Sequence, residues 1–295
     1  TALNSVTTDD DAGADSTMIK ANITAATQTY NDPVKIGGNA TLTASSTIDF
    51  INTLNGNTAG GQELIINSPD TEFRNTIGAT ATLKKLQTDS SGTTYFNTSA
   101  TTVKATTITL NDDVVLGVNV ATTGTTATFG RSVDATIAAT ETLTVNASGI
   151  TTFSAAVGGT TSLGSLITDS AGTTTIDTTV ADTGSITATT VTLNDKVLIK
   201  DDTTITATTV TFGNTINGLV AGAESLIVNA SGVTAFNGIM GATTKLGDVT
   251  TDAAGSAQIK ASLTVDDELT FNEAVSLTGN TTITATTARF QEAIT

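Results

Sequence analysis

Apolar and polar residues alternate along most of the chain in short segments that are bounded by Gly, Asn or Asp. In residues 203–212, alternate positions from Ile205 to Thr211 would face one side, and the intervening positions from Thr206 to Phe212 would face the other. A period of two residues is typical of β-strands. The pattern therefore predicts an all-β protein built from many short strands.

Three strings of residues recur with a period close to eighty. The first, Leu-x-x-Leu/Val-x-Thr-Asp, ends at Asp9, Asp89, Asp169 and Asp252. The second, Asn-Asp/Glu-x-Val-x-Ile/Leu, begins at Asn31, Asn111, Asn194 and Asn272. The third is found at 143–149, at 226–232 and more loosely at 64–67. Repeats at a fixed period indicate an array of structural units rather than unrelated domains, with copies at roughly 1–61, 62–140, 141–223 and 224–295.

A shorter period lies inside each copy. Residues 186–194 match residues 205–213 at an offset of 19. A large apolar residue followed four positions later by an aliphatic one marks most of these sub-repeats, as at Tyr30/Val34, Phe50/Leu54, Phe73/Ile77, Leu110/Val114, Phe129/Val133, Phe153/Val157, Leu193/Val197, Phe212/Ile216, Phe236/Met240, Phe271/Val275 and Phe290/Ile294. Four sub-repeats per copy predict about fifteen in the whole chain. Ile19, Phe96, Ile176 and Ile259 resemble a further marker, which we expect in a different column beside a loop of variable length.

A sub-repeat of about 20 residues is long enough for two or three short strands and the corners that return the chain to its start. Stacked sub-repeats would pair in parallel, about 4.8 Å apart, and bury the large apolar residues in an interior column. We therefore predict a parallel β-helix (β-solenoid) of about fifteen coils, continuous over 1–295. A string of β-sandwich domains is the alternative, but such domains have no reason to repeat a 19-residue unit internally.

Composition narrows the chemistry. The chain has no Cys, His or Trp, so disulfides, thiol catalysis and histidine-based catalysis or metal binding are excluded. Thr occupies 70 positions, and its β-branched side chain suits a strand. The net charge of −16 would repel a phosphate backbone, so we expect no nucleic-acid partner. No apolar run approaches the length of a membrane span.

The repeats at 143–153, 163–169 and 210–213 resemble the Thr/Gly/Asn-rich repeats of giant bacterial surface proteins, including filamentous-haemagglutinin-like adhesins and autotransporter passenger regions. The resemblance covers nearly the whole chain, but it lies in composition and period. It implies an exported, extended protein of the cell surface, in that group usually a stalk or an adhesive fibre. It identifies no ligand.

Acidic residues are the main candidates for a site. The periodic Asp9, Asp89, Asp169 and Asp252 would lie on one side of a solenoid, about 19 Å apart, which is too far to share a cation. We expect them, and the corners that begin at Asn31, Asn111, Asn194 and Asn272, to close turns through side-chain to backbone hydrogen bonds. The clusters 9–11, 201–202 and 266–268 suggest surface calcium or an acid/base pair, but solvated charge explains them better. The sequence therefore predicts no catalytic, cofactor or metal site.

These observations predict an extracellular structural protein without catalysis, either a rod or a filament subunit. An adhesin stalk that binds a glycan or a surface is the alternative, and a polysaccharide-active enzyme is less favoured because the coils are near copies. The last residues, 291–295, contain no polar capping segment. We therefore expect either end-to-end stacking of subunits or continuation in a longer chain, since open strand edges pair readily.

Overall fold

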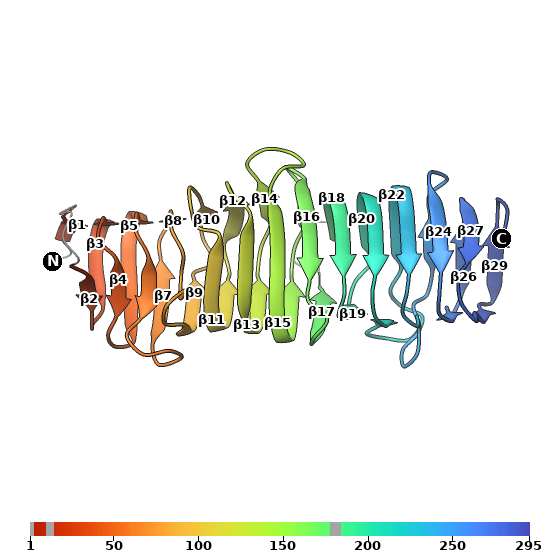
Figure 1. Cartoon of the computed structure of the whole chain (residues 1–295), viewed down its shortest axis with the longest axis horizontal. Coiled ribbons are helices and arrows are strands. Elements are labelled where there is room, and N and C mark those ends of the chain that lie inside the picture. Colours follow the sequence, from red (N-terminus) through yellow and green to blue (C-terminus); the bar gives the residue numbers. More distant parts are fainter. Residues whose placement is uncertain (1–2, 10–14, 178–183) are drawn as a thin grey trace.

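The protein is a straight rod of stacked β-strands (Figure 1). Its computed structural model describes residues 3–9, 15–177 and 184–295, and these residues form no helix. The coils run along the long axis from the N-terminal to the C-terminal end. The β-solenoid predicted from the sequence is confirmed, and the sandwich alternative is wrong.

The strands are short near corners and longer where the chain passes from one side of the rod to the next. The first are β1 (Leu3–Thr7), β2 (Thr17–Ile19), β3 (Ile23–Tyr30), β4 (Val34–Ile36), β5 (Ala40–Phe50), β6 (Leu54–Gly56), β7 (Glu63–Asn67), β8 (Asp70–Phe73), β9 (Leu83–Thr88), β10 (Thr93–Phe96), β11 (Thr102–Leu110), β12 (Asp113–Leu116), β13 (Val120–Phe129), β14 (Val133–Ala135) and β15 (Thr142–Phe153). They are followed by β16 (Leu163–Thr168), β17 (Thr173–Ile176), β18 (Gly184–Leu193), β19 (Lys196–Ile199), β20 (Thr203–Phe212), β21 (Ile216–Gly218), β22 (Leu226–Phe236), β23 (Val249–Thr251), β24 (Ser256–Ile259), β25 (Leu263–Thr264), β26 (Glu268–Phe271), β27 (Ala274–Leu277), β28 (Ile283–Thr284) and β29 (Thr287–Phe290).

The strands form three parallel ladders, A, B and C, which the chain visits in that order in each coil. Ladder A contains β2, β4, β6, Ile77, the first halves of β11, β13 and β15, then β16, the second halves of β18, β20 and β22, β24, β27 and Ile294. Ladder B contains the first halves of β1, β3 and β5, then β7, β9, the second halves of β11, β13 and β15, β17, β19, β21, Met240, β25 and β28. Ladder C contains the second halves of β1, β3 and β5, then β8, β10, β12, β14, Val157, the first halves of β18, β20 and β22, β23, β26 and β29.

Long strands bend where two ladders meet, and this bend changes which residues face the core. In β20, Ile205 and Ala207 are buried, but so are Val210 and Phe212, and the register shifts between Ala207 and Thr209. The extra residue of this bulge lies in β22, where Ala230 and Val233 oppose Ala207 and Thr209, and both strands change direction at this corner. The simple alternation expected for residues 203–212 is therefore wrong at the corner, where the inward set moves by one position.

Large side chains stack inside the rod because parallel pairing places equivalent residues directly above one another. The rings of Tyr30, Phe50, Phe73 and Phe96 stack along ladder C with centroids 5.1, 5.2 and 5.5 Å apart. Shorter stacks join Phe129 to Phe153 in ladder B, Phe212 to Phe236 in ladder A, and Phe271 to Phe290 in ladder C. Each stack continues in aliphatic residues of one buried core.

The eighty-residue repeat does not coincide with a whole number of coils, contrary to our expectation of four. Between Asp32 and Asp112 the chain forms eleven ladder segments: β4, both halves of β5, β6, β7, β8, Ile77, β9, β10 and both halves of β11. Four coils of three segments would need twelve. Each copy is therefore one side short of four coils, and the rod has about 13 turns rather than fifteen.

This mismatch explains why the aromatic stacks change sides. The repeat-equivalent positions Tyr30, Leu110, Leu193 and Phe271 lie in ladders C, B, A and C. One residue in each copy ends a column: Phe96, Ile176 and Ile259 pair with Phe73, Phe153 and Phe236 of the preceding coil. The next large apolar residue along the chain lies in a different ladder. The expected single interior column is thus three columns that succeed one another around the same shaft.

The stack predicts a large cost for a truncation in its middle. Phe73 is fully buried between Phe50 and Phe96. We expect Phe73→Ala to lower the free energy of unfolding by about 3 to 5 kcal/mol, because the lost apolar contact is compounded by a cavity. Urea denaturation followed by circular dichroism measures this change. Thr123→Ala, at an exposed position of β13, is the control and should change stability by no more than about 0.5 kcal/mol.

Candidate functional site

Each copy places one carboxyl group at the corner that follows Tyr30 or its equivalent. These carboxyl groups belong to Asp32, Asp112, Asp195 and Glu273. In the second copy this residue is Asp112, which is completely buried between β11 and β12. The hydroxyl of Thr88 donates to its Oδ1 at 2.6 Å, and that of Thr94 donates to its Oδ2 at 2.7 Å. Both partners come from the preceding coil. The carboxyl group therefore ties two coils together rather than closing a local turn.

Asn111 completes this corner. Its side-chain amide donates to the carbonyl oxygen of Thr88 at 2.8 Å, and its backbone N–H donates to the Thr88 hydroxyl at 3.1 Å. Thr88 thereby accepts from the Asn and donates to the Asp. The third copy repeats the arrangement, with Thr168 and Thr174 donating to Asp195, and Asn194 donating to Thr168. We expected these corners to close turns through side-chain to backbone hydrogen bonds. The Asn111 and Asn194 amides do bond to backbone oxygens, but Asp112 and Asp195 instead accept from threonine hydroxyls of the preceding coil.

The first and fourth copies depart from this arrangement. Asp32 is only partly buried and accepts a hydrogen bond from Thr17 at 2.9 Å. In the fourth copy the carboxyl belongs to Glu273, and Ala257 stands where Thr94 and Thr174 stand in the other copies. Glu273 is 1% exposed, and neither of its oxygens has a hydrogen-bond partner in the described part of the chain.

Burial changes the acidity of these groups. It raises the pKa of Asp112 to about 6, although the hydrogen bonds from Thr88 and Thr94 oppose the shift. Burial also raises the pKa of Asp195, again against two threonine hydroxyls. It raises the pKa of Glu273 to about 7; the nearby hydroxyl of Thr251 opposes the rise, and the charge of Asp252 adds to it. These carboxyl groups therefore exchange protons closer to neutral pH than exposed ones do.

In two copies the side chain of the periodic Asp of the Leu-x-x-Leu/Val-x-Thr-Asp string bonds to the preceding coil, whereas Oδ1 of Asp169 is buried without a partner among the described residues. Asp89 accepts from the backbone N–H of Ser68 at 3.3 Å and from the Ser91 hydroxyl at 2.9 Å, and Asp252 accepts from the N–H of Ala230 at 3.0 Å. The turn role is thus found, but its backbone partners lie on another coil. Because each copy is displaced by one side, the expectation that these residues share one side of the rod is wrong.

The same turns need glycine three positions later. Gly92, Gly172 and Gly255 have positive φ angles of 87, 80 and 78°. A Cβ at Gly92 would collide with the carbonyl oxygen of Pro69 on the preceding coil. The recurring Asp-x-x-Gly spacing therefore follows from the close approach of two backbones.

The non-periodic acid clusters are parts of the framework where the structure describes them. Asp202 accepts from the N–H of Ser225 at 2.8 Å, Asp266 pairs with Lys245 at 3.1 Å, and Glu268 pairs with Arg289 at 3.1 Å. Asp10 and Asp11 lie outside the described residues. Within 3–9, 15–177 and 184–295, no group of three or more acidic residues is placed to hold a metal ion.

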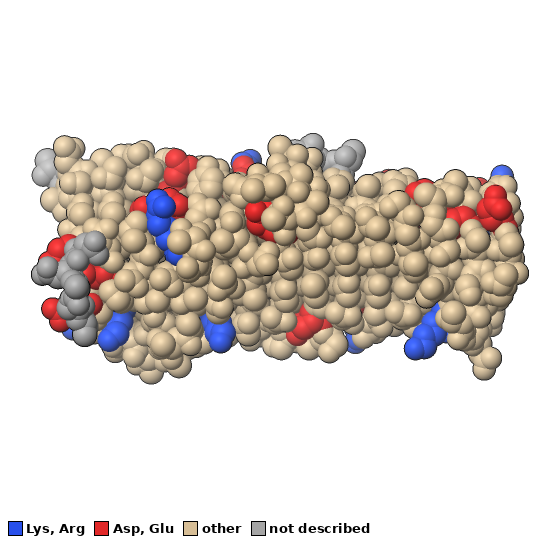
Figure 2. Space-filling model, turned by 45° about the horizontal axis from the view of Figure 1, so that its top comes forward, with Lys and Arg blue, Asp and Glu red and all other residues tan. Residues whose placement is uncertain are grey.

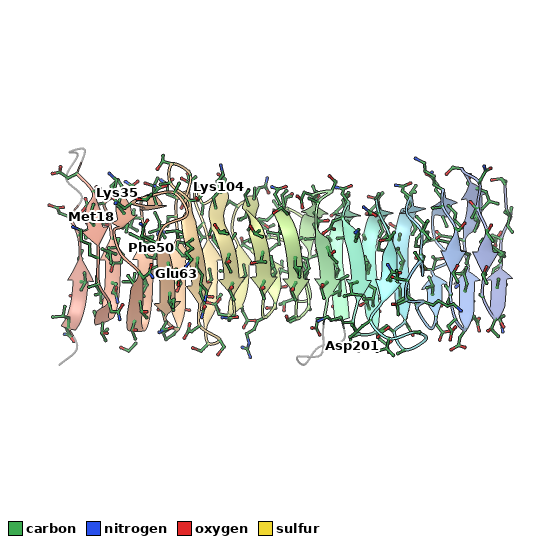
Figure 3. All side chains as sticks on the ribbon, turned by 90° about the horizontal axis from the view of Figure 1, so that it is seen from below. Met18, Lys35, Phe50, Glu63, Lys104 and Asp201 are labelled. Atoms are coloured by element: carbon green, nitrogen blue, oxygen red, sulfur yellow. The ribbon has the colours of Figure 1, made fainter. Side chains whose placement is uncertain are left out.

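A shallow groove on the outer side of ladder C is a second candidate site, and the sequence analysis did not identify it. It has a volume of about 340 Å³ and crosses β5, β8 and β10. The residues that give it chemical character are Thr47, Asp49, Asp70, Glu72, Arg74 and Tyr95. Charged side chains are sparse on the surface, and groups of both signs lie together in the N-terminal half (Figure 2). Figure 3 shows side chains projecting from the rod along its whole length, with Lys35 and Lys104 at one edge of the view and Asp201 at the opposite edge.

A network of ion pairs fixes one wall of the groove. Nε of Arg74 donates to Oδ1 of Asp49 at 3.1 Å, and Nη2 of Arg74 donates to Oε2 of Glu72 at 2.6 Å and to Oδ2 of Asp49 at 3.1 Å. The amide of Asn97 donates to the other oxygen of Glu72 at 2.7 Å. The carboxylates raise the pKa of Arg74 further, so it stays charged. Planar guanidinium–carboxylate pairing of this kind holds side chains in defined orientations.

The signal that could have identified the groove is a departure from the repeat. Aligned with the third sub-repeat of the other copies, Asp70, Glu72 and Arg74 correspond to Ile150, Thr152 and Ser154 and to Val233, Ala235 and Asn237; Asp49 corresponds to Thr128 and Thr211, and Tyr95 to Thr175 and Gln258. The last copy carries Arg289 at the position of Asp49, but charged residues and an aromatic ring occupy these five positions together only in this part of the rod. The similarities between the copies predict the fold, whereas the groove lies where the copies differ.

Comparisons with known proteins assign the chain to no family. No protein-family model matches it, no curated protein matches it, and no solved structure matches it. In the described part of the chain, no helix is long and apolar enough to cross a membrane. The resemblance to bacterial surface repeats therefore remains a prediction from composition and period.

The buried corner predicts a defined pH dependence. An unfolded Asp loses its proton near pH 4, whereas folded Asp112 keeps it until about pH 6. Its contribution to stability is therefore fully present below pH 4 and is lost as the pH rises to about 6. We expect Asp112→Asn to remove roughly 3 kcal/mol of this dependence and to be at least as stable as the wild type at pH 7.

Urea denaturation between pH 3.5 and 7.5 measures both effects. Asp113→Asn is the matched control, because Asp113 is a half-buried neighbour on the outer face that pairs with Arg131 at 3.7 Å. It should leave the pH profile between 4 and 6 nearly unchanged. A profile for Asp112→Asn identical to that of the wild type would show that the buried carboxyl group does not titrate in this range.

Proposed function

We propose that the chain is an extended structural module of a bacterial cell surface, a rod or filament subunit that performs no catalysis. The observation that supports a rod most directly is the continuity of the three ladders along the described chain, with one buried core from Ile19 to Val275. About 13 turns at about 4.8 Å per turn give a rod on the order of 60 Å long. The cell-surface location rests on the resemblance of the repeats alone.

Rigidity in such a rod needs no cofactor or disulfide. Each coil pairs with the next through backbone hydrogen bonds on three sides, and its large side chains stack on those of its neighbours. Bending the rod would open pairs in one ladder and compress the stacks near the others. A spacer that holds distant parts of a surface assembly apart requires this resistance.

The last coil offers an edge for further stacking. In β29, the backbone N–H of Thr287 donates to the carbonyl oxygen of Asp267 in the preceding coil. Because successive residues of a strand direct their backbone groups to opposite sides, the N–H and C=O of Ala288 point away from that coil. No described strand pairs with this edge. Leu277 and Ile294 in the same region are 42% and 49% exposed. These features suit either a second subunit or further coils of a longer chain.

A filament subunit and a spacer rod differ in how their assembly depends on protein concentration. If subunits stack end to end, we expect the wild-type chain to elongate into fibres as its concentration rises, measured by sedimentation velocity and electron microscopy. Ala288→Pro should suppress elongation at least tenfold, because it removes the outward N–H while leaving the bonds of Thr287 to the preceding coil in place.

Ala288→Val is the matched control, since it changes the same exposed position but keeps the N–H group. It should elongate like the wild type. A wild-type chain that remains monomeric at all concentrations would contradict the filament form and leave the rod as a spacer. Equal elongation of the Pro variant would place the contact elsewhere on the surface.

A further inference from the structure

The groove over β5, β8 and β10 has the features of a binding site added to a repetitive framework. Asp49, Glu72 and Tyr95 are register partners on three consecutive coils, which places them in one row about 10 Å long. Equivalent rows elsewhere on the rod carry mostly small or uncharged residues. A rod needs only such residues for its outer face, so stacking does not account for this row.

The groove presents hydrogen-bond donors and acceptors side by side. Arg74 uses Nε and Nη2 on Asp49 and Glu72, and its Nη1 group has no partner among the described residues. The carboxylate of Asp70 is exposed and also has no partner there. The fixed carboxylates of Asp49 and Glu72 each retain lone pairs for a further hydrogen bond.

Charge narrows the class of ligand. An anion would meet three carboxylates, from Asp49, Asp70 and Glu72, in a chain that already carries a net charge of −16. A small cation would approach Arg74, whose charge already neutralises part of the acidic wall. A neutral ligand with many hydroxyl groups pays neither penalty, because each hydroxyl can donate to a carboxylate and accept from the guanidinium.

Tyr95 supplies the remaining part of such a site. Its side chain is only partly buried at the groove, and it combines an apolar ring with a polar hydroxyl. The ring faces of sugars are also apolar and their edges are polar. We propose that this groove binds a neutral oligosaccharide, with Tyr95 against a ring face and Asp70 and Arg74 on its hydroxyl groups. This proposal does not depend on whether the rods assemble end to end.

The two tyrosines allow a direct test of the location. The chain has no Trp and only two Tyr, of which Tyr30 is buried in the core stack. A change in tyrosine fluorescence on adding a ligand therefore reports mainly on Tyr95. The probes are the neutral cellohexaose, maltohexaose and mannohexaose, with spermidine as the cation and oligogalacturonate as the anion. We expect a saturable change with at least one neutral probe and none with the charged ones.

Calorimetry with the neutral probe that binds then tests the residues. Asp70→Asn should weaken binding about tenfold, since a charge-assisted hydrogen bond is lost. Tyr95→Leu should weaken binding at least as much, whereas Tyr95→Phe keeps the ring and should stay within about threefold of the wild type. Asp267→Asn makes the same change of charge at an exposed residue directly before β26 and should have no effect. Thermal denaturation checks that all variants remain folded.

Three results would overturn the proposal. They are the absence of saturable binding by any neutral probe, saturable binding of spermidine or oligogalacturonate alone, and neutral binding that Asp70→Asn and Tyr95→Leu leave unchanged. The first two would reject a neutral glycan as ligand, and the third would reject this groove as its location. None of them bears on the rod itself, whose test is elongation.

Discussion

Parallel pairing of each coil with the next is the constraint on which the rest of this structure depends. It fixes the spacing of the coils and brings equivalent side chains into contact along the axis. A large ring is therefore accommodated best beneath another large ring, as in the stack from Tyr30 to Phe96. Burial of such rings contributes more stability than exposed ion pairs do. The few charges on the surface are thus free to serve purposes other than folding.

The mismatch between repeat and coil distributes every repeated feature around the rod. Eleven segments per copy move each equivalent position back by one side, so buried carboxyl corners and aromatic stacks occupy the three sides in turn. After three copies the pattern returns to its starting corner, and Asp32 and Glu273 both lie where ladder C gives way to ladder A. No side of the rod is therefore uniformly aromatic or uniformly aliphatic. We expect its resistance to bending to be similar toward each of the three sides.

The near identity of the copies makes their differences informative. In two copies a buried Asp receives two threonine hydroxyls, while in the fourth a Glu and an Ala leave the carboxyl group without a partner. The groove is a difference of another kind, because it replaces small outward residues with charged and aromatic ones. The first change lies inside the framework and affects its titration, whereas the second leaves the framework intact and alters only its outer face.

The sequence by itself determined the all-β class, the stacking of coils and the inward position of the large apolar residues, because alternation and periodicity are local properties of the chain. It did not determine the number of segments per repeat. Long strands such as β20 pass from one ladder to the next without a Gly, Asn or Asp inside the strand, so this corner left no local signal in the sequence. Only the tertiary structure placed Thr88 and Thr94 around Asp112, and Tyr95 beside Glu72, because these partners are 18 to 24 positions apart and meet only when one coil rests on another.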